Sequence, residues 1–573
     1  MEYKIETKNC QNCKNDFVIE SEDFLFYERI KVPSPTFCPE CRLQRRMSWR
    51  NDRSLYKRDC SMCSESMIAM YPSDAVFPVY CKKCWNSDNW EAVDYGRDYD
   101  FSRNFFEQIK DLFNSVPHPA IWQRNVTDSP YSNMVGESKN VYLSISVVMG
   151  SENVFYSWGI DKSFNIFDCH NMKESSDCYE NIEGEKNYNS QNLFLSRNCM
   201  DSYFLVDCSN CSNCILSSNL RNKEFYIKNK SYSKEEYFKE LEKYNLGSRS
   251  SRLAIQNEFN KLLKNTIYRF AHIIKSVDST GNNLLNTKNC INSFEIYNTE
   301  NSKYCYRVLN EKDVMDVTYS GKAELLYEHL TGALNDYNVK FSISAQDSVL
   351  NAEYTDTCVT SKNIFACAGL RSKSNVIFNK VYSDSDFENL REKIINHMNE
   401  NPYIDKKGNT YRYGEFFPLE LSPFGYNETI AQDFFPITES EIISYGYNYK
   451  IPDIKHHKIS ILNKDIPDNI KNVDKSILNE VLECAHKGEC DHHCSKAFNL
   501  KKDELDFYKK HNIPIPDKCS NCRYYERFVK ILPPKLWRRS CMKESCSNTF
   551  ETSYAPDREE IVYCEKCYQN EVC

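Results

Sequence analysis

The chain has 573 residues, enough for several domains, and a formal net charge of −8 at pH 7. Its first residues contain no apolar signal region, and no apolar run approaches the length of a membrane span, so we expect a soluble, cytoplasmic protein with no membrane partner. In that compartment its 28 cysteines are expected to be thiols and metal ligands. The negative charge does not favour nucleic-acid binding by the chain as a whole, so such binding would depend on local patches.

Residues 1–90 are predicted to form a double zinc-ribbon module, because four Cys-x-x-Cys pairs occur there. Two thiolates two residues apart can reach one ion, and two such pairs complete a tetrahedron. We expect sequential pairing, although the spacing alone also permits a cross-braced arrangement. The two expected ligand sets are Cys10, Cys13, Cys38 and Cys41, then Cys60, Cys63, Cys81 and Cys84. Four thiolates leave no open coordination position, which indicates structural metal.

The same module is predicted in residues 481–573. A shift of 481 residues places Cys13, Cys38, Cys41 and Cys60 on later cysteines, and after a two-residue insertion a shift of 483 does the same for Cys81 and Cys84. The predicted ligands are Cys490, Cys494, Cys519 and Cys522, then Cys541, Cys546, Cys564 and Cys567. The least regular is Cys490, which is displaced by one residue; its rivals are Cys484, His486, His492 and His493. About four Zn²⁺ ions are expected in total.

Each module also contains a basic connector with interleaved aromatic residues. The residues concerned are Arg42, Arg45, Arg46, Trp49, Arg50 and Arg53 in the first module, and Arg523, Arg527, Trp537, Arg538 and Arg539 in the second. Arginine and exposed aromatic rings suit phosphate groups and unstacked bases, so this pattern predicts binding of RNA or a ribonucleoprotein. The alternative is that the guanidinium groups compensate the −2 charge of a four-thiolate zinc centre.

Between the modules the sequence predicts a duplicated, β-rich body. A helical connector is expected in residues 91–135, followed by a first β-repeat block in 136–230 and a second in 286–382. The phrase Ser-x-Asn followed by alternating apolar residues recurs at steps of 12 to 13, as at Asn140, Asn153 and Asn165. Turn-strand units of constant length favour a β-solenoid with about two units per coil, with an antiparallel β-sandwich as the alternative.

The two β blocks are related by a shift of 150 residues, which places Cys208 on Cys358. Each is followed by a predicted amphipathic helix with a serine cap, in segments 231–285 and 383–400, and residues 401–480 are expected to form an irregular aromatic-rich connector. The first block contains a run of cysteines, Cys208, Cys211 and Cys214, with Cys199 nearby. Because Cys211 and Cys214 become Ser361 and Ile364 in the second block, buried thiols are favoured over a metal cluster. The fold class is therefore a multidomain, β-rich α+β protein.

Several longer phrases resemble a known group of proteins. They are Phe37-Cys-Pro-Glu-Cys-Arg-Leu-Gln-Arg-Arg46, Cys519-Ser-Asn-Cys-Arg523, Tyr554-Ala-Pro-Asp-Arg558 and the Leu-Arg-Asn-Lys block at 220. With them the chain resembles uncharacterised zinc-ribbon, cysteine-rich proteins of small-genome, uncultivated bacteria. The resemblance implies zinc and cytoplasmic residence, and it carries no activity.

Together these patterns predict a non-catalytic, zinc-binding scaffold that binds RNA or a ribonucleoprotein through its arginine-rich connectors. The alternative is a protein–protein interaction scaffold that uses the β-repeat surface. A third hypothesis is an enzyme that acts on a polymer in a solenoid groove, with carboxylates such as Asp161, Asp168 and Asp177. The sequence contains no nucleophile motif or phosphate loop that would support it, and it sets no oligomeric state.

Overall fold

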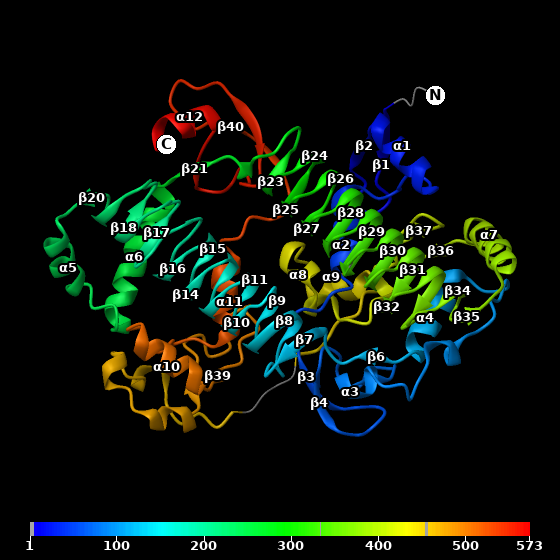
Figure 1. Cartoon of the computed structure of the whole chain (residues 1–573), viewed down its shortest axis with the longest axis horizontal. Helices are drawn as coiled ribbons and strands as arrows, with labels where there is room; N and C mark the ends of the chain where they lie inside the picture. The colour runs from blue at the N-terminus through cyan, green and yellow to red at the C-terminus, as the bar shows by residue number, and fades with distance from the viewer. Residues whose placement is uncertain (1–4, 333, 453–456) are drawn as a thin grey trace. The chain divides into compact units, whose positions relative to one another are not determined.

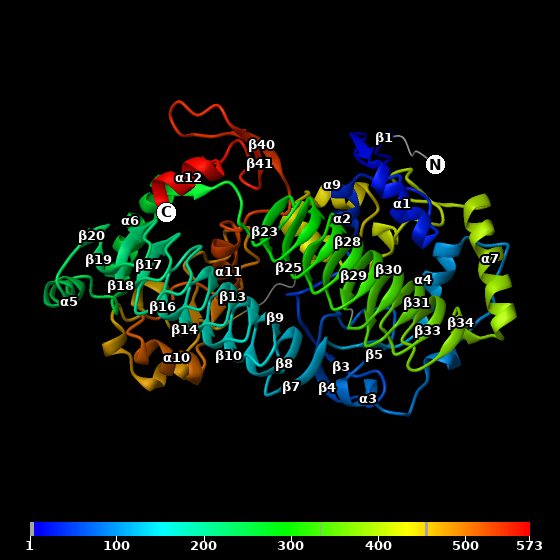
Figure 2. The same ribbon diagram turned by 45° about the horizontal axis from the view of Figure 1, so that its top comes forward.

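The computed structural model describes residues 5–332, 334–452 and 457–573. Within these ranges the chain is a strand-rich α+β protein with cysteine groups near both ends, and Figures 1 and 2 show its ribbon from two directions. Residues 1–4, part of the stretch in which no signal region is expected, lie outside the described ranges. A search of the described residues finds no helix that is both long and apolar enough to span a membrane.

The chain folds into two compact units, and neither is continuous in sequence. The first contains Met1–Ile121, Ala271–Ile451 and Pro533–Leu536, and the second contains Trp122–Phe270, Pro452–Leu532 and Trp537–Cys573. The N-terminal cysteine module therefore belongs to the unit of the second β block, and the C-terminal module to that of the first. A division of the sequence into consecutive segments does not reveal this grouping, because the contacts that join each module to its block are distant in sequence. The ion pair Arg42–Asp316 spans 274 positions, and Arg523–Asp168 spans 355.

The first β block, in the second unit, is a ladder of short strands that pair in parallel except at β19 and β20. Alternate strands pair, so that Glu152 lies beside Phe164 and Trp158 beside His170. Apart from β19–β20, the described pairs of this ladder are parallel, unlike the hairpins of the antiparallel alternative. The strands are β7 (Gln123–Thr127), β8 (Asn133–Tyr142), β9 (Ile145–Val148), β10 (Glu152–Phe155), β11 (Trp158–Asp161), β12 (Phe164–Phe167), β13 (His170–Lys173), β14 (Ser176–Tyr179), β15 (Ile182–Glu185), β16 (Tyr188–Gln191), β17 (Tyr203–Val206), β18 (Ser212–Ser218), β19 (Glu224–Ile227) and β20 (Lys230–Ser231).

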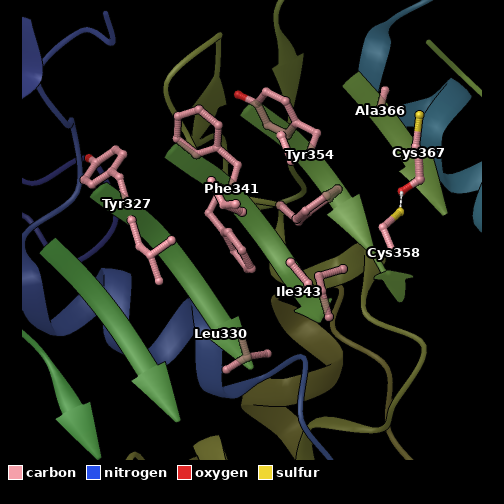
Figure 3. Packing of buried hydrophobic residues seen from close by; sticks show 14 of the residues in the cluster. Tyr327, Leu330, Phe341, Ile343, Tyr354, Cys358, Ala366 and Cys367 are labelled. Carbon is pink, nitrogen blue, oxygen red and sulfur yellow. Dashed lines mark hydrogen bonds between the residues drawn. The ribbon is translucent and has the colours of Figure 1, made fainter. Parts of the chain in front are cut away.

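The second β block, in the first unit, repeats this plan and is parallel until β34 and β35. Rings from neighbouring strands fill its core: Phe341 stacks on Tyr354 with 4.7 Å between ring centroids, as Figure 3 shows. The strands are β22 (Ile273–Ile274), β23 (Gly281–Leu285), β24 (Lys288–Ile291), β25 (Ser293–Tyr297), β26 (Glu300–Lys303), β27 (Tyr306–Leu309), β28 (Lys312–Gly321), β29 (Glu324–Gly332), β30 (Tyr337–Gln346), β31 (Leu350–Asp356), β32 (Cys358–Val359), β33 (Lys362–Ala368), β34 (Ser374–Ile377) and β35 (Lys380–Val381).

The repeated asparagines lie where the backbone turns. Left-handed conformations recur at every third residue in parts of the ladder, as at Asn153, Tyr156 and Gly159, and asparagine tolerates this region better than most residues. The asparagine side chains also bond to one another: Nδ2 of Asn140 donates to Oδ1 of Asn153, and Nδ2 of Asn153 to Oδ1 of Asn165, both over 2.9 Å. Asparagine therefore suits these turns, both by its tolerance of positive φ and by its side-chain bonds.

Small polar side chains inside the ladders satisfy backbone groups at these turns. The N–H of Cys169 donates to Oγ of Ser157 over 2.9 Å, the Cys169 thiol donates to the carbonyl of Phe167, and its Sγ accepts from the N–H of Asn181. In the second block the thiol of Cys358 donates to the carbonyl of Cys367 (Figure 3). Serine, cysteine and asparagine can share these positions because each can bond to the turn backbone.

The cysteine run of the first block belongs to this interior. Cys199, Cys208, Cys211 and Cys214 are all buried, and they are not among the metal-ligand groups found in the described residues. The thiol of Cys208 donates to the carbonyl of Val206 over 3.4 Å. The predicted burial of these four cysteines is confirmed.

Helices cap or flank the ladders. The segment 91–135, predicted as a helical connector, is helical only in part: it forms α4 (Phe105–Ser115), which buries Phe105, Phe106 and Ile109 and packs against β33, and it then continues into strands. Both predicted serine caps are confirmed: Ser233 precedes α5 (Lys234–Glu242), and Ser383 precedes α7 (Asp384–Glu400). The remaining elements outside the cysteine modules are β6 (His118–Pro119), α6 (Arg249–Asn265), β21 (Ile267–Arg269), β36 (Tyr403–Ile404), β37 (Thr410–Tyr411), α8 (Ile430–Phe434) and α9 (Glu439–Ser444).

The two cysteine modules are built from matching elements. The N-terminal module contains β1 (Glu6–Asn9), β2 (Asp16–Ile19), α1 (Ser21–Ile30), α2 (Pro39–Met47), β3 (Tyr56–Asp59), β4 (Ser66–Ala69), β5 (Val79–Tyr80) and α3 (Lys82–Trp85). The C-terminal module contains β38 (Leu482–Glu483), β39 (Ala497–Phe498), α10 (Lys502–Lys510), α11 (Ser520–Phe528), β40 (Trp537–Ser540), β41 (Thr549–Thr552), β42 (Ile561–Tyr563) and α12 (Glu565–Val572).

Candidate metal centres

Each cysteine group combines a hairpin and a helix start. The first two cysteines lie at the end of a two-stranded hairpin such as β1–β2, and the third is the residue that precedes a helix. These preceding residues are Cys38 before α2, Cys81 before α3, Cys519 before α11 and Cys564 before α12. Free N–H groups and the positive end of the helix dipole favour a thiolate at this position.

The sulfurs come together in the sequential arrangement, not the cross-braced one. Cys10, Cys13, Cys38 and Cys41 form one group and Cys60, Cys63, Cys81 and Cys84 the next, and within each group all four Sγ atoms lie within 4.8 Å of one another. The same holds for Cys541, Cys546, Cys564 and Cys567 in the second unit. The widened spacing between Cys541 and Cys546 therefore does not disturb the group.

The third group requires a correction: its fourth member is Cys484, not Cys490. Sγ of Cys484 lies within 4.8 Å of those of Cys494, Cys519 and Cys522. The N–H of Cys519 donates to Sγ of Cys484 over 3.3 Å, which makes Cys484 the structural counterpart of Cys10.

That hydrogen bond recurs in all four groups and fixes the assignment. The amide of the third cysteine donates to the sulfur of the first over 3.2 Å from Cys38 to Cys10, and over 3.3 Å from Cys81 to Cys60 and from Cys564 to Cys541. Sequence alignment misses Cys484 because nine residues separate it from Cys494, whereas two separate Cys10 from Cys13. An ungapped shift places the match at Asp491, beside Cys490.

The spacing of the sulfurs fits a four-coordinate ion. Metal–sulfur bonds of about 2.3 Å in a tetrahedron place the sulfurs about 3.8 Å apart. The Sγ–Sγ distances are 3.7 Å for Cys13 and Cys38, 3.9 Å for Cys63 and Cys81, and 3.9 Å for Cys546 and Cys564. A disulfide would require about 2.05 Å, and all 28 cysteines are free thiols. The donor sets therefore fit a thiophilic cation with no open position.

Backbone donors also favour the thiolate form at two of these positions. Burial alone would raise the pKa of the Cys60 thiol, but the N–H groups of Cys81, Cys63 and Met62 outweigh it and lower that pKa to about 6. At Cys564 burial acts in the same upward direction, and the Asn548 amide together with the N–H of Cys567 lowers the pKa to about 6. The thiolate is therefore the favoured form of Cys60 and of Cys564 at neutral pH.

The connector residues that were predicted to bind nucleic acid mostly face inward. Seven of the eleven side chains are buried, so they are not available to a ligand as the structure stands; these are Arg42, Arg45, Arg46, Trp49, Arg50, Arg523 and Arg527. Arg53, Trp537 and Arg539 are half-buried, and Arg538 is exposed. Most of these residues therefore do not form an exposed surface, and RNA binding by the chain stays a prediction.

In the first unit the buried arginines join the cysteine module to the β block. Arg42 lies 2.8 Å from Asp316, and Arg46 contacts both Asp316 (3.2 Å) and Glu328 (3.0 Å). Arg45 bridges Glu328 (2.6 Å) and Glu415 (2.9 Å). Helix α2 is thus fixed to strands β28 and β29 by charge pairs. These carboxylates compensate the charges of the buried arginines, a role that neither sequence-based alternative included.

The second unit contains the same contact. Nε of Arg523 donates to Asp168 over 3.0 Å, and a terminal nitrogen of Arg527 donates to Asp168 over 2.8 Å. Arg523 is the counterpart of Arg42 under the 481-residue shift. Asp168 is the counterpart of Asp316. Two coils of the second block, between Asp316 and Cys358, have 13 residues where the first block has 12, so the shift between the blocks is 148 residues at Asp168 and 150 at Cys208.

Aromatic contacts repeat alongside the charges. Arg42 lies 5.4 Å from the ring of Tyr304, and Arg523 lies 4.6 Å from the ring of Tyr156. Edge-to-face ring pairs follow the same correspondence: Tyr27 with Tyr327 at 5.6 Å in the first unit, and Tyr508 with Tyr179 at 5.8 Å in the second. Each module therefore docks on its β block in the same way.

Two of the three carboxylates considered for catalysis have structural partners. Asp168 is buried against Arg523 and Arg527, and Asp177 pairs with Lys510 at 2.8 Å and with His511 at 3.1 Å. The described contacts assign neither carboxylate to a groove.

Comparisons with protein-family models, curated proteins and solved structures found no match for this chain.

Proposed function

We propose that this protein is a zinc-stabilised, non-catalytic scaffold that binds a partner protein along its β blocks. Four groups of four sulfurs at tetrahedral spacing support zinc, since thiolate-only sites of this kind are typical of structural Zn²⁺. Bound zinc would supply folding energy to modules with little core of their own. The closed ligand sets and the structural partners of Asp168 and Asp177 support a role without catalysis.

We interpret each ladder as a β-solenoid with two strands per coil. The parallel register at steps of 12 or 13 residues supports this interpretation, and so do the left-handed turns at every third residue. A solenoid presents the same side-chain positions again and again along its length, which suits an extended binding surface.

The observation that carries the partner proposal is an exposed apolar pair that occurs in both blocks. Tyr188 and Met200 are neighbours across the first ladder and are 49% and 45% exposed. Tyr337 and Leu350 are neighbours at the corresponding place in the second and are 44% and 36% exposed. Tyrosine beside an aliphatic side chain provides contact area at low entropic cost, as in protein interfaces. The connector arginines predicted to bind RNA are mostly buried, so they offer no comparable surface.

The test is a pull-down from nuclease-treated lysate in high salt with the whole chain. We expect the combined change Tyr188→Glu and Tyr337→Glu to abolish recovery of a specific partner, while a control with Lys186→Gln and Lys322→Gln on exposed turns retains it. Equal recovery by both variants would contradict the proposal, as would a ligand that disappears on nuclease treatment.

A further inference from the structure

The third cysteine group has neighbours that the other three groups lack. Four side chains, His486, Cys490, His492 and Cys522, offer ligand atoms that all lie within 4.8 Å of one another. Cys522 therefore belongs to this set and to the four-cysteine group at the same time. Its Sγ lies 3.8 Å from Sγ of Cys484, 3.5 Å from that of Cys519 and 3.7 Å from that of Cys490.

These extra ligands come from an insertion within an otherwise duplicated module. Residues 485–493 replace the two residues that separate Cys10 from Cys13, and this loop contributes His486, Cys490 and His492. The loop is ordered by consecutive turns: the N–H of Lys487 donates to the carbonyl of Cys484, and the N–H of Glu489 to that of His486. The N-terminal module, which lacks this loop, therefore shows the same site without the extra ligands.

The N-terminal module shows what the position looks like without extra ligands. Cys41, the counterpart of Cys522, accepts a hydrogen bond from Nδ2 of Asn12 over 3.2 Å. Where the first copy places an amide donor on the sulfur, the C-terminal copy places a thiol and two imidazoles. A sulfur flanked in this way can bridge two cations.

A ring nitrogen of each histidine is positioned to bind a metal ion through its lone pair. Nδ1 of His486 and Nδ1 of His492 are both buried and have no hydrogen-bond partner, which is costly unless a cation takes the lone pair. On the far side of the first ring, Nε2 of His486 lies 3.6 Å from Oε1 of Glu526, an arrangement common behind metal-ligating histidines. The ring of His492 stacks on Tyr525 with 5.6 Å between centroids, which restrains its orientation.

We infer that the C-terminal module binds a second ion beside its third cysteine group, with the Cys522 thiolate shared between the two ions. Cys490, His486 and His492 complete the second coordination sphere. Two sulfurs and two imidazole nitrogens suit Zn²⁺ in a tetrahedral site. Cys490 and both histidines are half-buried, whereas three sulfurs of the neighbouring group are buried, so the second ion should exchange more readily. The inference depends on the proposed function only in requiring metal at the third group.

The test counts Zn²⁺ ions per intact chain by native mass spectrometry. We expect five for the wild-type chain and four for the triple variant His486→Ala, Cys490→Ser, His492→Ala, with Asp491→Asn on the same loop as a control that keeps five. A mild chelator should remove one ion from the wild type and none from the triple variant. Replacement of zinc by Co²⁺ should add an absorption spectrum of mixed sulfur and nitrogen coordination that the variant lacks.

Equal counts in wild type and variant would overturn the inference, and so would a fall from four to three, because a single ion would then use both ligand sets. These outcomes differ from failure of the proposed function, in which Zn²⁺ would be missing from the other three groups as well. Glu526→Gln gives an independent readout: loss of the carboxylate behind His486 should weaken the second ion by about 10- to 100-fold without changing the other four. An unchanged affinity would count against His486 as a ligand.

Discussion

Arg42 and Asp316 form an ion pair 2.8 Å apart in which both side chains are at most 1% exposed. Arg42 directly follows a metal-ligand cysteine, and Asp316 lies on a strand of the β block. The pair therefore links the folding of the metal module to that of the block. Arg523 and Asp168 make the corresponding link in the second unit, at 3.0 Å.

Removal of the shared carboxylate should be severely destabilising. Asp316→Ala leaves Arg42 and Arg46 buried with less compensation, and loss of one partner of a buried pair typically costs about 3–5 kcal/mol. Urea denaturation should show the loss in the free energy of unfolding. Asp313→Asn is the control: it removes only the charge that faces the half-exposed Arg29 and keeps an oxygen that can accept from Asn301, so it should cost about 1 kcal/mol or less. Similar losses for the two variants would contradict the docking role of Asp316.

Cysteines of the two classes should respond differently to serine. Cys60→Ser should remove one zinc ion, because its sulfur is one of four ligands. Cys178→Ser should leave the zinc content unchanged and cost less than about 1.5 kcal/mol, since a hydroxyl can replace the thiol that donates to the carbonyl of Ser176. Zinc analysis and thermal unfolding measure both effects. Loss of zinc from the Cys178 variant would show that the interior cysteines bind metal.

Stability should fall as the pH rises through neutrality. Glu311 is buried, its Oε2 has no hydrogen-bond partner, and burial raises the pKa of its carboxyl from 4.5 to about 8. The folded chain therefore holds this proton more tightly than the unfolded chain. The contribution to the free energy of unfolding is fully present below about pH 4.5 and is lost as the pH rises to about 8.

Glu311→Gln cannot ionise, so it should reduce this pH dependence in denaturation measured across the same range. It should not abolish the dependence, because burial also raises the pKa of Asp336 to about 7. An identical pH profile for variant and wild type would show that Glu311 is not held protonated in the folded chain.

The asparagines of the ladders should contribute to stability mainly because they tolerate a left-handed backbone conformation. Asn298 has a left-handed φ of 50° and bonds to Asn286 and Asn310, both over 2.9 Å. Asn298→Ala removes both bonds and places a less tolerant residue there, so we expect a loss of about 1–3 kcal/mol. Asn298→Gly removes the same bonds without the strain and should lose less. Equal losses in thermal unfolding would assign the effect to the side-chain bonds alone.

Much of the metal chemistry could be predicted from sequence because ligand spacing is local. Cys38 and Cys41 are three residues apart at the start of a helix, and that geometry follows from sequence alone. The fourth member of the third group could not be placed by an ungapped shift, since the nine-residue loop after Cys484 changes the spacing. The histidines and cysteines in this loop and directly before it are the signal that points to both Cys484 and the extra ligands.

The role of the arginines could not be predicted, because it depends on contacts distant in sequence. Arg42 beside aromatic residues has the composition of a nucleic-acid surface, and only the position of Asp316 shows that it is internal. The same limit applies to the grouping of modules with β blocks. The repeat of Asn140, Asn153 and Asn165 was informative because each of these asparagines has a left-handed backbone conformation, which asparagine tolerates locally.

The most direct test of the zinc-stabilised scaffold is zinc K-edge X-ray absorption on the triple variant His486→Ala, Cys490→Ser, His492→Ala, combined with its zinc count. We predict four ions per chain, each surrounded by four sulfurs at about 2.3 Å. Fewer than four ions, nitrogen or oxygen in the first coordination shell, or ligand cysteines oxidised to disulfides would contradict the claim that sulfur-bound metal holds both ends of this chain.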